Sequence, residues 1–234
     1  MRRSIIRSVA AAGAALLLAV APARAGEPAV LVELFTSQGC NACPPADRAL
    51  AALTEAPDVV ALSLHVDYWD YLGWRDSFAR PLFTRRQYAY RDRFGARMVY
   101  TPQMVVQGRA RLVGSRREEL AASIAAARAE GRASVLSIEA TEDGLTAVIA
   151  AGGARGVIWL ATYERAASVD IERGENRGKR LTYHNVVREL ARLGWADGSG
   201  GRFAVPRPEP GQGVAVWIQG EGLGPVTAAA KFER

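Results

Sequence analysis

The 234-residue sequence is poor in the side chains that most often bind soft metals, with two cysteines, two histidines and three methionines. It contains no methionine-rich or histidine-rich tract, which argues against a copper carrier of that kind. No basic stretch carries interleaved aromatic side chains, so a nucleic-acid-binding protein is not expected. The composition is otherwise globular, with 49% hydrophobic and 23% charged residues, and the length suits one large or two small domains.

Long hydrophobic runs are also scarce, and the one present lies at the N-terminus. Residues 8–22 are apolar and uncharged, they follow three arginines, and Ala23-Arg24-Ala25 resembles a signal peptidase site. The run is shorter than the roughly 20 residues of a membrane-spanning helix. We therefore interpret residues 1–25 as a signal peptide rather than a membrane anchor, and we expect a periplasmic or secreted protein with no membrane span left after cleavage.

The N-terminal segment also bears on the export route and on the charge. Arg2-Arg3 loosely matches a twin-arginine signal, so this route and the general one both stay open. Removal of four arginines with residues 1–25 takes the formal charge from +6 to +2. The basic composition therefore says little about partners.

Both cysteines lie in one short stretch, Cys40-Asn41-Ala42-Cys43. Exported proteins meet an oxidising compartment, so the pair is expected to form a disulfide at some stage. A bridge across so short a loop stabilises a fold by only about 2 kcal/mol, which favours a chemical role over a structural one. A structural pair and a metal site remain the competing interpretations.

The stretch around the cysteines shows a strand–helix–strand pattern. Residues 30–35 and 59–66 are short and apolar, which predicts buried strands, and Pro44 and Pro45 suit the first turn of a helix between them. The following pattern predicts a helix over about 81–94, strands over 100–108 and 109–114, and a helix that begins with a capping box of Ser115 and Glu118 and ends near Gly131. This order of elements is that of the thioredoxin fold.

From Ser134 onward, short apolar runs alternate with turn residues, and residues 186–193 suggest a short helix. Such runs predict an antiparallel, sandwich-like arrangement. The predicted fold class is therefore α/β, with a thioredoxin-like domain over residues 26–132 followed by a smaller antiparallel β-rich domain over residues 133–234.

The C-x-x-C pair between a strand and a helix is typical of thiol–disulfide exchange. The positive end of the helix dipole lowers the pKa of the first thiol, and the second thiol can displace a mixed disulfide. We assign Cys40 as the nucleophile and Cys43 as the resolving thiol.

Thr101-Pro102 and Glu33 complete the predicted site. In thioredoxin-like folds a cis-proline faces the disulfide and leaves the preceding backbone free to pair with substrate; the alternative is a trans proline that opens a strand. A buried Glu33 would have a raised pKa and could take the proton of Cys43. The alternative for Glu33 is a structural pair, for instance with an arginine.

Further polar and aromatic residues could lie near the pair. His65 and Asp67 end the second predicted strand, on the same rim as Cys40, and Trp69 and Trp74 follow. His65 could tune the thiolate or bind a ligand, or it could be structural, and the tryptophans could pack or carry substrate. Residues 174–178 predict a hairpin tip, either a plain turn or a loop that reaches over the Cys pair.

Six stretches resemble the motifs of a known family: residues 33–40, 43–47, 65–70, 100–104, 174–178 and 184–188. They resemble one secreted bacterial family, known as domain of unknown function twelve-twenty-three, with a thioredoxin-like fold. The resemblance covers nearly the whole mature chain and implies a thioredoxin-like domain with its Cys pair at Cys40 and Cys43. It brings no established activity. The chain differs from ordinary thioredoxins in having no tryptophan just before Cys40 and no Gly-Pro between the cysteines.

These observations predict an exported thiol–disulfide oxidoreductase-like protein without a cofactor. Its partners would be a protein thiol or disulfide substrate and a redox partner protein that resets the pair. The alternatives are a periplasmic metal-binding protein, in which His65 or Met104 joins the thiolates to hold Cu(I), and a non-catalytic interaction module that uses the C-terminal part.

Overall fold

The computed structural model describes residues 29–130, 135–141 and 144–234. The predicted signal peptide and the predicted domain boundary after residue 132 lie outside these residues. The helices are α1 (Pro44–Thr54), α2 (Pro81–Arg93) and α3 (Arg117–Ala129), with short 3-10 turns at Asp70–Leu72 and Glu221–Leu223. The strands are β1 (Val30–Thr36), β2 (Val59–His65), β3 (Gln103–Val106), β4 (Ala110–Val113), β5 (Leu136–Thr141), β6 (Gly144–Ile149), β7 (Arg155–Asp170), β8 (Arg180–Asp197), β9 (Gly201–Val205), β10 (Gln212–Gln219) and β11 (Val226–Glu233).

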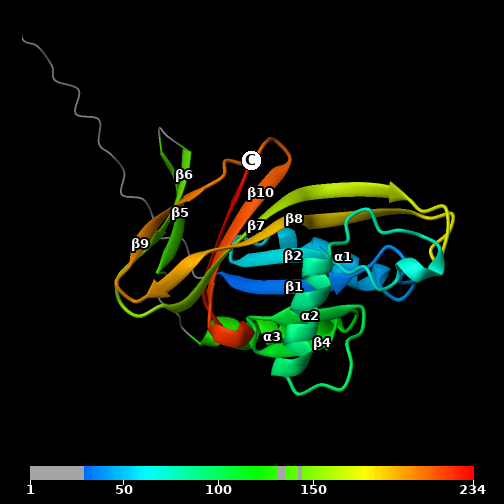
Figure 1. The fold of residues 1–234 in the computed structure, drawn as a ribbon, viewed down its shortest axis with the longest axis horizontal. Helices are drawn as coiled ribbons and strands as arrows, with labels where there is room; N and C mark the ends of the chain where they lie inside the picture. The colour runs from blue at the N-terminus through cyan, green and yellow to red at the C-terminus, as the bar shows by residue number, and fades with distance from the viewer. Residues whose placement is uncertain (1–28, 131–134, 142–143) are drawn as a thin grey trace, which may run out of the picture.

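Most strands belong to one mixed sheet of eight, in the order β11-β10-β7-β8-β2-β1-β3-β4. β1 and β2 are parallel, β2 meets β8 in parallel through the single pair Ser63 and Val186, and the other neighbours are antiparallel. A second sheet of three strands, β5-β6-β9, lies at the far end of the long β7–β8 hairpin from its tip (Figure 1). Both halves of the chain therefore contribute strands to the eight-stranded sheet.

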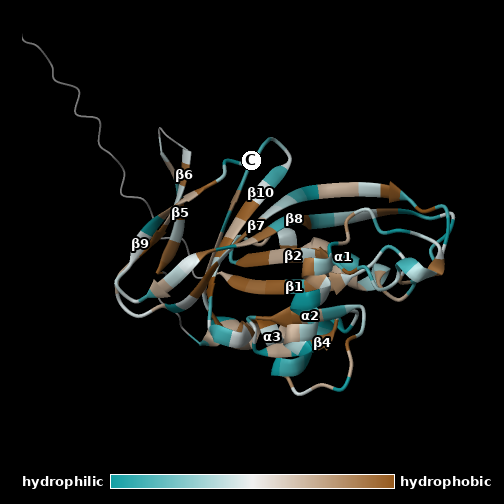
Figure 2. Cartoon of the chain, in the orientation of Figure 1, coloured by the Kyte–Doolittle hydropathy of each residue, from teal (hydrophilic) through white to brown (hydrophobic). Residues whose placement is uncertain are grey.

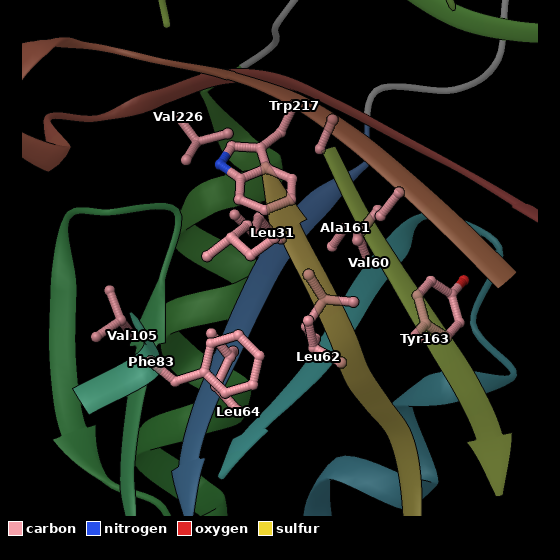
Figure 3. Close-up of a cluster of buried hydrophobic side chains, with 14 of the residues drawn as sticks. Leu31, Val60, Leu62, Leu64, Phe83, Val105, Ala161, Tyr163, Trp217 and Val226 are labelled. Atoms are coloured by element: carbon pink, nitrogen blue, oxygen red, sulfur yellow. The ribbon is translucent and has the colours of Figure 1, made fainter. Parts of the chain in front are cut away.

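The alternation of apolar side chains along β1 fills the cores on both faces of the large sheet. Val32 and Leu34 pack with residues of α1 and α3, whereas Leu31 and Phe35 pack with residues of α2. The core on the α2 side also takes side chains from β7, β10 and β11, among them Trp217 (Figure 3). The central strands are correspondingly the most hydrophobic part of the chain (Figure 2).

The predicted fold class is wrong. The structure has no thioredoxin-like α/β domain followed by a smaller β-rich domain, because β7, β8, β10 and β11 extend the same sheet that contains β1 to β4. Among the described residues, more lie in strands than in helices, and the helices include three α-helices. The runs that predicted short separate strands are parts of the 16-residue β7 and the 18-residue β8.

The helices and strands predicted for the first half of the chain agree better with the structure than the predicted fold class does. The structure confirms helices beginning at Pro44 and Pro81 and strands over the ranges expected for β1 and β2. Two local details are wrong. Residues 186–193 are part of β8 because they pair with β7, and α3 begins after Arg116 without a side-chain capping hydrogen bond, so the predicted capping box is not formed.

A buried ion pair connects β1 to α2 and β10. Nε of Arg86 donates to Glu33 at 2.6 Å, the Arg86 side chain is 3% exposed, and Nη2 of Arg86 donates to Gln219 at 2.8 Å. The guanidinium also lies over the rings of Trp159 and Trp217, at 5.0 and 5.5 Å from their centres. Removing one partner of such a pair leaves an uncompensated buried charge.

We expect Glu33→Ala to lower the free energy of unfolding by about 3–5 kcal/mol, because Arg86 stays buried without its carboxylate. Urea unfolding of the variant measures this loss. The matched control is Glu119→Ala in the exposed pair with Arg116, where we expect a change below about 1 kcal/mol. A loss as small as that of the control would show that the Glu33 pair does not hold the sheet together.

Candidate functional site

The two cysteines lie in the turn between β1 and α1, and they form a disulfide. Cys40 is 1% exposed and Cys43 is fully buried. Cys43 is the N-cap residue of α1, where its carbonyl accepts hydrogen bonds from the amides of Ala46 and Asp47. The disulfide therefore sits at the positive end of the helix dipole.

Gln38 anchors the backbone of the turn before the disulfide. Its amide donates to Asp76 at 2.8 Å, and its side chain bonds Ser77 and the indole of Trp74. The whole residue is buried. Residues 74–77 of the loop after β2 thus fix the position of the Cys turn from one side.

The tip of the β7–β8 hairpin covers the Cys turn from another side. The buried side-chain amide of Asn176 donates to the carbonyls of Gln38 and Cys40, both at 2.9 Å. Glu175 accepts a hydrogen bond from the amide of Asn41 at 3.3 Å. Of the two alternatives for residues 174–178, a loop that reaches the Cys pair is therefore the one observed.

Thr101-Pro102 lies at the same end of β1 as the cysteines. The peptide bond is cis, as predicted, and Pro102 directly precedes Gln103, the partner of Phe35 in the β1–β3 ladder. Trp69 lies between the two segments. Its indole donates to the Thr101 hydroxyl at 2.8 Å, and its Cβ is 3.1 Å from the position that a Cβ on Gly39 would take.

Glu33, predicted as the proton acceptor, is buried at 1% exposure. Its carboxylate is engaged by Arg86 and Tyr90 of α2, on the face of the sheet that packs with α2. The cysteines lead into α1, which packs on the opposite face. These contacts match the alternative, a structural pair with an arginine, and they bring Glu33 to α2 rather than to the disulfide.

His65 ends β2 and pairs in register with Thr36 of β1. It is completely buried, its Nδ1 lies 2.7 Å from Asp76, and the rings of Phe78 and Tyr183 pack against it edge-on. Burial alone would raise the pKa of Asp76, but the charge of His65 and hydrogen bonds outweigh it and hold the pKa below its ordinary value. The loop residue Asp67 accepts a hydrogen bond from Thr84 of α2 at 2.7 Å.

Asp47 is a residue that the sequence analysis missed. It lies four residues after Cys43 in α1, so the two occupy one face of the helix, and it is 7% exposed. Thr36 donates to its Oδ1 at 2.8 Å, and its Oδ2 has no hydrogen-bond partner within the described residues. Burial raises the pKa of Asp47 to about 7, against the opposing effects of His65 and Thr36. The i+4 spacing from Cys43 was the signal in the sequence.

The described part of the chain holds no cluster of three His, Cys, Asp or Glu side chains suited to a metal ion. In that same part, no helix combines the length and the hydrophobicity needed to cross a bilayer. The residues gathered at the end of β1 form a buried disulfide at the start of α1, with the protonatable carboxyl of Asp47 one helical turn further on.

The family described as "Protein of unknown function (DUF1223)" matches residues 31–219. The chain belongs to this family. The matched range includes every site residue named above, from Glu33 through the Cys pair and Pro102 to Asn176. No curated protein matches the chain.

Two solved structures extend the comparison. A crystal structure of an Agrobacterium tumefaciens protein is similar to this DUF1223 chain at 32% identity with a TM-score of 0.74, covering 87% of this chain and 93% of that one. HBP35 of Porphyromonas gingivalis shares 13% identity with a TM-score of 0.56, covering 88% of this chain and 75% of that one. The second likeness concerns the fold alone.

We expect Asp47 to make the stability of this DUF1223 chain depend on pH. Asp47 interacts electrostatically with four neighbouring groups: His65, Asp76, Arg48 and Tyr183. A carboxyl whose pKa is raised in the folded state keeps a proton that the unfolded chain releases, so its contribution to stability is lost as the pH rises through about 7. The free energy of unfolding of Asp47→Asn should therefore rise relative to that of the wild type by on the order of 2 kcal/mol between about pH 5 and pH 8.

Urea unfolding at the two pH values measures this difference, with Asp92→Asn as the control because the Asp92 side chain is 65% exposed. A difference between Asp47→Asn and wild type that stays constant with pH would contradict the raised pKa.

We expect Asn176→Ala to speed reduction of the disulfide by dithiothreitol roughly 30-fold. The two hydrogen bonds from Asn176 hold the hairpin tip over the Cys turn, and each contributes about 1 kcal/mol. Stopped-flow thiol counting measures the rate. The control is Glu175→Ala, which removes one longer, exposed bond and should have a smaller effect. Equal rates for Asn176→Ala and wild type would mean that the tip does not limit access.

Proposed function

We propose that this protein is an exported thiol–disulfide exchange protein that uses Cys40 and Cys43 as its redox pair. The observation that carries the proposal is the arrangement of a C-x-x-C disulfide at the start of α1 with a buried, protonatable Asp47 one turn further on. A purely structural bridge across four residues would add only about 2 kcal/mol and would not require a buried carboxyl beside it.

The exchange step balances without a cofactor. In the oxidising direction, a substrate thiolate attacks Cys40, a bond forms between the two sulfurs, and the Cys40–Cys43 bond breaks with its electron pair on Cys43. A second substrate thiolate then attacks the substrate sulfur of the mixed disulfide and releases Cys40 as a thiolate. The substrate leaves as a disulfide, and the protein is left as the dithiol. In the reducing direction, the same steps run backwards.

Asp47 is suited to handle the proton of Cys43. With a pKa of about 7, its carboxyl can give a proton to the departing Cys43 thiolate and accept one when Cys43 attacks in reverse. The positive end of the α1 dipole would stabilise a thiolate on Cys40. This role replaces the one predicted for Glu33, whose carboxylate is bound to Arg86.

The proposed partners follow from the chemistry. One Cys pair is converted in each turnover, so a protein substrate and a second redox protein that restores the pair are both needed. The signal-peptide pattern of residues 1–25 favours a periplasmic or secreted setting, where disulfides persist. We favour exchange over a metal-binding role because His65 is held by Asp76 at one ring nitrogen and enclosed by aromatic rings.

The reduction potential of the Cys pair tests the proposal. The protein is equilibrated in glutathione or dithiothreitol redox buffers, and the free thiols are trapped and counted. We expect a value between about −120 and −270 mV, the range of proteins that exchange disulfides. A value below about −300 mV would mark a bridge that resists exchange and would refute the proposal.

Cysteine and carboxyl variants give the matched kinetic test. Cys43→Ser should accumulate a mixed disulfide with a substrate protein, whereas Cys40→Ser should not, because Cys40 is the attacking thiol. Asp47→Asn should slow turnover on the order of 100-fold, the lower range for loss of a general acid–base group. Trapping through Cys43 alone would reverse the assignment of the two thiols.

A further inference from the structure

A groove of about 300 Å³ lies between β8 and the first turn of α1. One wall is formed by Pro44, Asp47 and Arg48, and the other by the five successive residues Arg180–His184. Successive side chains of a strand point to opposite faces. A groove that touches all five residues therefore meets β8 along its edge, and it begins at the residue after Cys43.

The edge of β8 that faces this groove is open. β7 pairs with β8 from Arg180 to Asp197, but β2 pairs with it only at Val186. At Asn185 the backbone has a φ of 47°, and the Asn185 side chain donates to the carbonyl of Ala61 in β2. Within the described residues, Arg180–His184 thus has a strand partner on one edge alone. Such an edge is a template for an added strand.

Three buried polar atoms on residues that line the groove also lack partners. The hydroxyl of Tyr183, Oδ2 of Asp47 and Nδ1 of His184 make no hydrogen bond within the described part of the chain. Unsatisfied buried polar groups are costly, so most have partners in a working complex. A peptide backbone carries both donors and acceptors, so it offers partners to those of the three groups that become accessible when it binds.

The rim of the groove is positively charged. Arg48 is exposed at one side. Arg180 at the other side forms, among the described residues, an ion pair with Asp170, and both side chains of the pair are 68% exposed. An ion pair at that exposure contributes little, so Arg180 can exchange Asp170 for another carboxylate. Complementary charge gives specificity and speeds association. The rim therefore favours an acidic occupant.

We propose that this groove binds an extended, acidic peptide segment, which adds as a strand along Arg180–His184 beside the Cys40–Cys43 pair. The inference deepens the proposed function and rests on it in one respect: the bound segment is the part of a substrate protein that flanks its reactive cysteine. Backbone hydrogen bonds to β8 position the segment, Arg48 and Arg180 select its acidic side chains, and α1 directs it to the disulfide.

Binding is tested separately from exchange by using a probe without thiols. Fluorescein-labelled, reduced and carboxymethylated α-lactalbumin is an unfolded acidic protein, and it is titrated with the oxidised protein while fluorescence anisotropy is measured. We expect binding that weakens with salt. Arg48→Glu and Arg180→Glu together should weaken it by about tenfold, since one exposed charge contact is worth up to roughly a factor of five.

The matched control is Arg192→Glu, an exposed arginine in the other half of β8, which should leave binding unchanged. Reduced lysozyme whose thiols are blocked with iodoacetamide, which adds no charge and leaves the unfolded protein basic, should bind much more weakly than the acidic probe. Failure of the acidic probe to bind, or binding that is indifferent to the two groove arginines, would overturn the proposal.

Hydrogen exchange locates the bound segment. We expect the amides of residues 180–185 to exchange more slowly when the acidic probe is bound, because an added strand takes up the free edge of β8. Protection of residues 100–106 instead would place the peptide beside Pro102 and would overturn the groove assignment. The two proposals fail differently: peptide binding without any exchange refutes the proposed function, whereas exchange without binding at β8 refutes the groove.

Discussion

The buried ion pair between Glu33 and Arg86 is the interaction on which the joined sheet depends. β1 carries a carboxylate into a largely apolar core, and a charge there is tolerable only when its partners are in place. Arg86 comes from α2, and Gln219, which completes the arrangement, comes from β10 near the end of the chain. The central strand is therefore satisfied only when the helix on its face and the C-terminal strands have come together.

A similar constraint shapes the C-terminal end of β1. Residues 37–40, which lead into the disulfide, are buried, so their backbone groups need partners within the protein. Asp76 accepts from the amide of Gln38, and Asn176 donates to two carbonyls of the turn. Three segments far apart in the sequence thus meet at the cysteines. One of them is the tip of the β7–β8 hairpin, and next to this tip the Arg180–His184 edge of β8 has no second strand partner within the described residues.

The sequence predicted the parts of this arrangement that local signals determine. The apolar runs of β1 and β2, the proline starts of α1 and α2 and the Cys pair could be read from short stretches. The cis bond before Pro102 was expected from the place of this proline relative to the Cys pair, by analogy with thioredoxin-like folds. The joined sheet could not, because the pairing of Ser63 with Val186 leaves no local trace. Val186, Val187 and Leu190 have helical spacing, yet pairing with β7 makes them strand.

The candidate site likewise has features that the local sequence predicts and others that arise only in the assembled fold. That Glu33 is buried followed from its place in an apolar strand, but its partner Arg86 is 53 residues away, and no pattern connects them. Asp47 was within reach of local reasoning, since a carboxyl four residues after a helix-capping cysteine shares its face. The contacts of Asp76 and Asn176 with the Cys turn are properties of the assembled fold.

The hairpin tip that covers the disulfide is synthesised after the cysteines themselves. Asn176 lies 136 residues after Cys40 in the chain, so both thiols leave the ribosome long before the residue that will enclose them. Until the β7–β8 hairpin has been made and has docked, the pair in the incomplete chain is open to any oxidant, reductant or foreign thiol that it meets. Enclosure of the disulfide is consequently a late event of folding.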